Sequence, residues 1–435
     1  MVNQAQKQPG RTLAIGLAMT TAMWVFAFIA FMQVGLALGE VLFALTLLVL
    51  VVGGGVIGFT GGGWKGGVGA GLICASINML LIGAVVGGSE DAAQMTGDAV
   101  LWALGVYGVS VFLCGLGALV ASALTRNTRS LQINWRCILG NVIFGMVFFM
   151  LIVGGLVTGL QVGMAVPDWP NTFGHNMLLY PLSEMTDGVY FEHAHRLYGM
   201  LVGLTALIFF FAVMRLDRRP WLVVVAGVFI VLLLIQGTLG GTRVTENSIA
   251  LAAVHGVFGQ VVFAFSALFG VFMHTRWKAV PREETQSTGS WLGAWLVIGV
   301  LAQIAIGSAY RHYKWPMGIE AAGVNGLLQL HIVLAVLVLL LVIITGGVAI
   351  TQNRDERVIQ RAGVLVLCIL GLQILFGILA LIAVLSTGKD AAMSPLTVAI
   401  TTAHQATGGL LLAFSARLCA WLWRRRTPSS PSVTA

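Results

Sequence analysis

The stretch Phe191-Glu192-His193-Ala194-His195-Arg196 stands where a long loop gives way to an apolar run that we expect to form a membrane helix. Ionisable residues are costly inside a bilayer, and those found there usually face a protein interior and carry function. Four of these six side chains are ionisable. The stretch therefore marks a candidate functional site at the edge of the membrane.

Outward from this stretch, the composition is that of a polytopic membrane protein. Of the 435 residues, 58% are hydrophobic and 9% are charged, whereas about a quarter are charged in soluble domains. Repeated apolar runs of about 20 residues are each long enough to cross the hydrocarbon core as a helix. We expect an all-α membrane protein and exclude alternating strands.

The apolar runs predict twelve spans, four before Arg126 and eight after it. The first is either a span or a signal-like anchor, and its length favours a span although Ala37-Leu38-Gly39 would permit cleavage. The expected spans lie at about 12–38, 41–60, 68–87, 99–124, 137–160, 192–214, 221–241, 249–273, 291–310, 325–350, 362–386 and 395–423.

Positive charge predicts the orientation of these spans. Of 24 Lys and Arg residues, 18 fall on one side of the predicted membrane and 4 on the other. Because cytoplasmic loops carry excess Lys and Arg, both termini are expected in the cytoplasm of a bacterial-type inner membrane. The net charge of +8 is thus a topology signal, and no nucleic-acid partner is expected.

The basic stretch Arg126 to Arg136 predicts a linker between modules. Residues 1–130 would form an amino-terminal extension of about four helices. Residues 131–285 and 286–435 would form two halves of four helices each. The five cysteines form no CxxC pair, so neither a disulfide nor a zinc site is expected.

Glutamine, glycine and histidine recur at matching positions in these halves. A Gln-x3-Gly motif lies in a helix running outward, and the next helix carries a histidine. In the first hairpin glycines alone mark the motif. The series is Gly155 and Gly159 with His195, Gln236 and Gly240 with His255, Gln303 and Gly307 with His331, and Gln373 and Gly377 with His404. Such self-similarity predicts a duplicated four-helix unit.

The four repeated histidines predict two axial pairs for haem iron. In each half they lie on the second and fourth helices, which face each other across a bundle core where cofactors bind. Imidazole is a good haem ligand, whereas no carboxylate or cysteine recurs to complete a zinc site. A hydrogen-bonded packing role is the alternative for each histidine alone. The remaining histidines, His175, His193, His274 and His312, do not fit the repeat.

Residues 135–425 resemble the heme A synthase family of membrane proteins. The resemblance rests on Glu192-x-x-His195-Arg196, on the loop Val166-Pro167-Asp168-Trp169-Pro170 and on the four repeated histidines. It implies two pseudo-symmetric four-helix bundles, with oxidation of a heme O methyl to a formyl group in the first half. A heme b cofactor would occupy the second. His195 and His255 would then bind the substrate haem, and His331 and His404 the cofactor haem.

The resemblance also assigns roles around the first histidine. Glu192 matches the family's important glutamate, which implies proton transfer or positioning of water; the alternative is that it pairs with Arg196 and anchors the helix end. Arg196 would alternatively bind a haem propionate. Asp168 and Trp169 would contact the substrate from the loop, although Trp169 is equally suited to an interfacial anchor.

Two features depart from the family pattern. Many members carry a cysteine pair in outer loops, and the loops here have none. The four amino-terminal spans are extra and lack histidine, so we expect a docking, stabilising or assembly role for them. Expected partners are an unidentified electron-transfer protein and heme O synthase or oxidase assembly proteins. The alternative functions are a b-type cytochrome that passes electrons and a non-catalytic haem-binding assembly factor.

Overall fold

The computed structural model is all-helical apart from one pair of two-residue strands. It describes residues 10–32, 36–86, 92–125, 133–217, 219–281, 287–317, 322–386 and 393–426. Twelve helices within these ranges are long and apolar enough to cross a membrane, which confirms the expected number of spans. The basic residues Lys7, Arg126, Arg129, Arg218, Arg282 and Lys389, used to predict the orientation, lie outside the described residues.

Several helices extend beyond the apolar runs that predicted them. Helix α7 begins at Asp187 rather than near 192, so Glu192 and Arg196 lie inside the helix. An acidic residue in the first turn favours this start because it faces the positive end of the helix dipole. The helix bounds are α1 (Arg11–Phe31), α2 (Leu36–Phe59), α3 (Gly63–Asn78), α4 (Ile82–Val86), α5 (Ala92–Leu124), α6 (Trp135–Gly159), α7 (Asp187–Leu216), α8 (Pro220–Thr245), α9 (Ile249–Phe272), α10 (Arg276–Ala279), α11 (Ser287–Met317), α12 (Ala322–Thr351), α13 (Arg357–Ser386) and α14 (Pro395–Arg425).

The chain divides into two compact units. The first contains Met1–Met150 and Val162–Ile230, and the second contains Leu151–Gln161 and Val231–Ala435. These divisions fall within α6 and α8, whereas the repeat predicted boundaries near residues 130 and 285. Packing therefore groups the amino-terminal helices with α7, and the expected division into three modules stays a prediction about the repeat.

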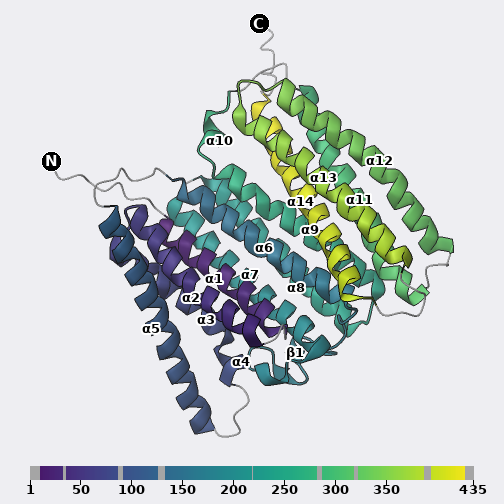
Figure 1. Ribbon diagram of the computed structural model, residues 1–435. Helices are drawn as coiled ribbons and strands as arrows, with labels where there is room; N and C mark the ends of the chain where they lie inside the picture. The colour runs from purple at the N-terminus through teal and green to yellow at the C-terminus, as the bar shows by residue number, and fades with distance from the viewer. Residues whose placement is uncertain are drawn as a thin grey trace. The chain divides into compact units, whose positions relative to one another are not determined.

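In the first unit, α5 packs along α2 and α3 through glycines (Figure 1). A Cβ atom built on Gly54 would lie 2.1 Å from the Cys114 carbonyl oxygen, and one on Gly58 would lie 2.2 Å from that of Ala118. Small residues allow this backbone approach, which adds van der Waals contact between membrane helices. The turn between α2 and α3 uses positive φ at Gly61 and Gly63, as expected for a tight helix connection.

The extension is tied to α7 by two tyrosines. Tyr190 donates a hydrogen bond to the Phe28 carbonyl at 2.5 Å, and Tyr198 donates to the Trp24 carbonyl. The Trp24 and Tyr198 rings pack edge to face at 5.0 Å. These contacts connect α1 to the helix that carries Glu192 and His195. A stabilising role for the extra spans therefore has a direct structural basis.

In the second unit, four helices contact one another in a ring. Helix α11 packs on α12 and α14, and α13 packs on the same two helices, while α9 lies against α11 and α14 (Figure 1). Both α12 and α14 start well before their histidines. From Ala322 to His331 and from Pro395 to His404 is nine residues in each case, so the two imidazoles lie at equal distances along their helices.

The close contact between α2 and α5 makes a first prediction. Gly54→Leu should lower the thermal stability of the detergent-solubilised protein by the equivalent of ~1–3 kcal/mol or more, since overpacking a tight core costs about that much. The contacted atom is a backbone carbonyl, which has little freedom to move. The measurement is the temperature at which the monodisperse peak is lost in size-exclusion chromatography.

The matched control is Gly108→Leu. Gly108 lies on α5 with no heavy atom within 4 Å of its added Cβ, so this variant should keep the wild-type transition. Equal transitions for both variants would contradict the packing described.

Candidate functional site

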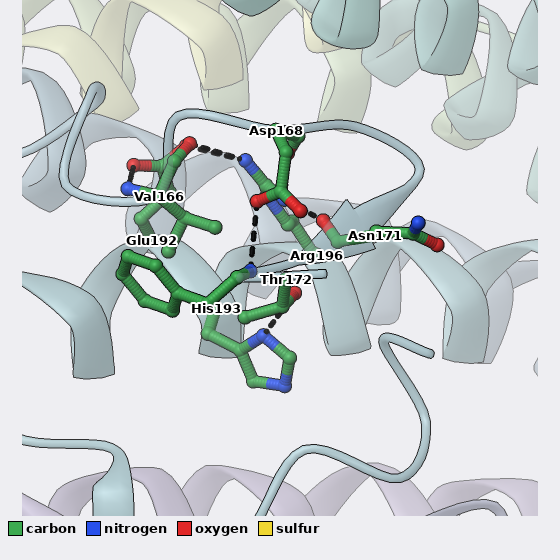
Figure 2. Close-up of polar contacts among 8 residues, drawn as sticks. Val166, Asp168, Asn171, Thr172, Glu192, His193 and Arg196 are labelled. Carbon is green, nitrogen blue, oxygen red and sulfur yellow. Dashed lines mark hydrogen bonds and ion pairs between the residues drawn. The ribbon is translucent and has the colours of Figure 1, made fainter. Parts of the chain in front are cut away.

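The carboxylate of Glu192 joins α7 to the preceding loop (Figure 2). One oxygen accepts a hydrogen bond from the Val166 N–H, and the other accepts from the Arg196 guanidinium, both at 2.9 Å. The two side chains are four residues apart on α7 and almost fully buried. A buried ionisable group needs a close polar partner, and the two side chains supply this to each other.

Arg196 also fastens the loop through its backbone. It donates to the carbonyl oxygens of Val166, Asp168 and Asn171, at 2.9, 2.7 and 2.9 Å (Figure 2). A guanidinium has five N–H donors in a planar fork, and here at least four bonds point to the loop and to Glu192. This geometry supplies the anchoring role foreseen as the alternative for Glu192, whereas the predicted catalytic role is untested by it. We call this set of contacts the loop latch.

His193 completes the attachment of the loop to α7. Its side chain is fully buried, and Nδ1 lies 3.1 Å from the Thr172 hydroxyl (Figure 2). The Tyr180 ring packs at 5.1 Å from the imidazole. Thr172 belongs to strand β1 (Asn171–Thr172), which pairs with β2 (His175–Asn176). His193 did not fit the repeat because its partner lies in the loop.

Asp168 shapes the loop itself. Its carboxylate oxygens accept hydrogen bonds from the Phe173 and Gly174 N–H groups, each at 2.8 Å. Burial alone would raise the pKa of Asp168, but these donors and the charge of Arg196 outweigh it and lower the pKa. A lowered pKa stabilises the loop at neutral pH, and that contribution is lost as the pH falls through it. Trp169 is 39% exposed, and contact of either residue with a substrate stays a prediction.

His331 and His404 come together in the second unit. Their ring centroids are 6.3 Å apart and the ring planes are nearly perpendicular, at 85°. The residues are 73 positions apart in the sequence, on α12 and α14. The repeat predicted this pair, and the fold brings the two imidazoles into one place.

The Gln-x3-Gly motif holds these imidazoles from the neighbouring helix. In α11, Gln303 donates to the His331 carbonyl at 2.9 Å, and its amide nitrogen lies within 3.2 Å of both ring nitrogens. A Cβ on Gly307 would be 2.7 Å from Cε1 of His331. The glutamine thus fixes the backbone beside the ring, and the glycine leaves room for the ring.

The place of the glycine recurs in the other two complete motifs, and the glutamine contact recurs in the motif around His255. Gln236 donates to the His255 carbonyl at 3.1 Å, and a Cβ on Gly240 would lie 2.9 Å from that imidazole. A Cβ on Gly377 would lie 3.1 Å from Cε1 of His404. The glycine beside each imidazole reflects a packing relation between paired helices, and Gln373 differs in that its side-chain oxygen accepts from Thr407.

The first hairpin differs from the other three. Gly155 and Gly159 of α6 lie in the second unit, where added Cβ atoms would meet Gln405 and Arg311, at 2.8 and 3.1 Å. His195 belongs to the first unit and His255 to the second. Their pairing therefore stays a prediction.

The separation of the His331 and His404 rings matches that of two imidazoles that share one metal. With metal–nitrogen bonds of about 2 Å, ligands on opposite sides of one metal place their ring centroids roughly 6–6.5 Å apart. The 6.3 Å separation lies in this range. Nδ1 of His404 is buried without a hydrogen-bond partner among the described residues, so protein contacts leave that atom unoccupied. The donor set suits haem iron.

Arg311 was not among the site residues predicted from the sequence. It lies on α11, four residues beyond Gly307 and eight beyond Gln303, and so on the face that meets His331. Its guanidinium donates to the Gln405 side chain at 2.8 Å and to the Gly155 carbonyl at 2.9 Å. The available signal was an arginine at that spacing in a helix, but the predicted span ended at 310.

The loop latch makes a second prediction. Arg196→Ala leaves the Glu192 carboxylate buried without its counter-charge, a change that typically costs ~3–5 kcal/mol. The loop should open, and chymotrypsin should cleave after Phe173 at least about tenfold faster in detergent. The cleavage rate is measured by mass spectrometry of the fragments.

Arg219→Ala is the control for this experiment. It removes another ion pair of the first unit, with Asp217, away from the loop. Cleavage after Phe173 should stay at the wild-type rate, and an unchanged rate in Arg196→Ala as well would show that the latch does not hold the loop.

No model of a known protein family matches this chain, and a comparison with curated proteins likewise finds no match.

Proposed function

We propose that this protein is a heme A synthase-like oxidoreductase that converts the heme O methyl group to a formyl group for use in terminal oxidases. The observation that carries the proposal is the His331–His404 pair, with imidazole centroids 6.3 Å apart. The motif resemblance around Glu192 and His195 supplies the link from haem binding to oxidation.

In this proposal the chain forms two pseudo-symmetric four-helix bundles that follow the extension. His331 and His404 hold a heme b cofactor in the second half, and His195 and His255 hold the substrate haem in the first. Haem iron supplies the oxidation chemistry when bound. The protein contributes axial imidazoles, a dry apolar surround and control of water.

The residues near His195 provide that control. Glu192 precedes His195 by three residues, within one turn of α7, and its carboxylate has two partners, the Val166 N–H and Arg196. The carboxylate holds the loop over the start of the helix. We propose that it also accepts or relays a proton during oxidation, when one of these hydrogen bonds is exchanged for water.

The remaining parts of the proposal concern location and partners. The termini face the cytoplasm and the haem sites lie toward the outer side of a bacterial-type inner membrane. An electron-transfer protein that remains to be identified exchanges electrons with the site. The haem substrate arrives from heme O synthase, and the product passes to oxidase assembly proteins.

A second candidate is a b-type cytochrome that only transfers electrons. One observation favours it: both Glu192 oxygens are engaged in the loop latch, so structure alone accounts for this glutamate. A haem-binding assembly factor without turnover meets the same description. These candidates predict bound haem without a formyl product.

Pigment analysis tests the proposed reaction. Expressed in a host that makes heme O but lacks heme A, the wild-type protein should yield a formyl haem in the extracted pigment. His331→Ala and His404→Ala should lose bound heme b. If heme b is retained on the wild-type protein but no formyl haem appears, the electron-transfer function replaces the proposed one.

Glu192→Gln removes the carboxylate while keeping an acceptor for the Val166 N–H. The amide still accepts from the Val166 N–H but neither relays a proton nor pairs with a cation, so bound haem should be retained while conversion falls at least about 100-fold, a typical contribution of acid–base catalysis. Glu184→Gln, on the same loop but exposed, should convert normally. Wild-type conversion by Glu192→Gln would reduce Glu192 to an anchor.

A further inference from the structure

Arg311 is a buried arginine close to the histidine pair, and no carboxylate of the described residues pairs with it. Arg196 pairs with Glu192, Arg276 with Glu356 and Arg425 with Asp355. Arg311 instead donates to an amide oxygen and a backbone carbonyl. A membrane-embedded guanidinium without a counter-charge is unfavourable, so this arrangement calls for an anion from another source.

The place of Arg311 indicates what that anion belongs to. The Gln303, Gly307 and Arg311 series puts successive turns of α11 along one face, and the middle residue of the three lies against the His331 imidazole. Gln405, whose side-chain oxygen accepts the hydrogen bond from Arg311, directly follows His404 in α14. Arg311 therefore lies one turn beyond Gly307 in α11, and its guanidinium reaches α14 at the residue next to His404.

The chemistry of the guanidinium narrows the ligand further. Two of its five N–H donors are used, by Gln405 and Gly155, and three remain for a ligand. A guanidinium fork matches the two oxygens of a carboxylate. Lys314, three residues further along α11 and 4% exposed, adds a second positive charge on the same side.

An ordinary structural role accounts for only part of this. Basic residues at helix C-termini are stabilised by the helix dipole and usually extend their charge into water. Arg311 instead turns its charge inward, and both of its bonds lie within the second unit. Arg417 of α14 also bonds a carbonyl, that of Ala267, but it lies thirteen residues beyond His404 in the same helix.

We propose that Arg311 is the carboxylate-binding residue for the ligand held by His331 and His404, and that it pairs with a haem propionate. The inference rests on the proposed haem function of that pair. The contact with Arg311 would make the second unit select a porphyrin that has a free carboxylate. The propionate edge of that porphyrin would face the carboxyl-terminal end of α11.

The test compares two iron porphyrins on apoprotein reconstituted in detergent: protohaem as the free acid and its propionate dimethyl ester. Wild-type protein should retain the free acid at least about tenfold better, because the ester accepts no charge-assisted pair. Arg311→Gln should lose most of that preference, and Arg311→Lys should keep part of it. Arg417→Gln is the control and should behave as wild type.

The reduction midpoint gives an independent readout from the optical spectrum. Removing a positive charge near the iron disfavours the added electron, so Arg311→Gln should have a lower midpoint potential than wild type and Arg417→Gln an unchanged one. If wild-type protein does not distinguish the free acid from the ester, the proposal fails. This comparison needs only the wild-type protein, so it holds even where Arg311→Gln does not fold. If wild-type protein binds neither porphyrin, the haem function itself fails and this inference with it.

Discussion

A charge buried among membrane helices must be neutralised by a partner at hydrogen-bond distance, because neither lipid nor protein interior solvates it. This constraint orders both units of the protein. In the first, Glu192 and Arg196 neutralise each other, and the spare donors of Arg196 bind three loop carbonyls. In the second, Arg311 is bonded to an amide oxygen and a backbone carbonyl, with no carboxylate partner among the described residues.

The loop latch gives one pair of residues two consequences. It fastens the loop to the first turns of α7, and it holds the buried carboxylate of Glu192 beside the helix turn that carries His195. The amino-terminal helices reinforce the same segment, because Tyr190 and Tyr198 bond to carbonyls of α1. The first of the extra spans thus contacts α7 directly.

Glycine has a repeated purpose in both units. In the first it brings α2, α3 and α5 to backbone contact, where Gly54 meets a carbonyl. In the second it makes space beside an imidazole, as Gly307 does for His331. Because glycine has no Cβ, Gly54 allows two helix backbones to touch and Gly307 leaves room for the imidazole of His331.

The sequence by itself determined the class of fold, the number of spans and the residues that repeat, because hydropathy and motif spacing are local properties. It also indicated that His331 and His404 form a pair. Only the tertiary structure decided that Glu192 bonds to Val166, that His193 meets Thr172 and that Arg311 lacks a carboxylate partner among the described residues. Those relations join distant segments, and a side chain's partners depend on how helices and loops pack, which spacing along one helix does not encode.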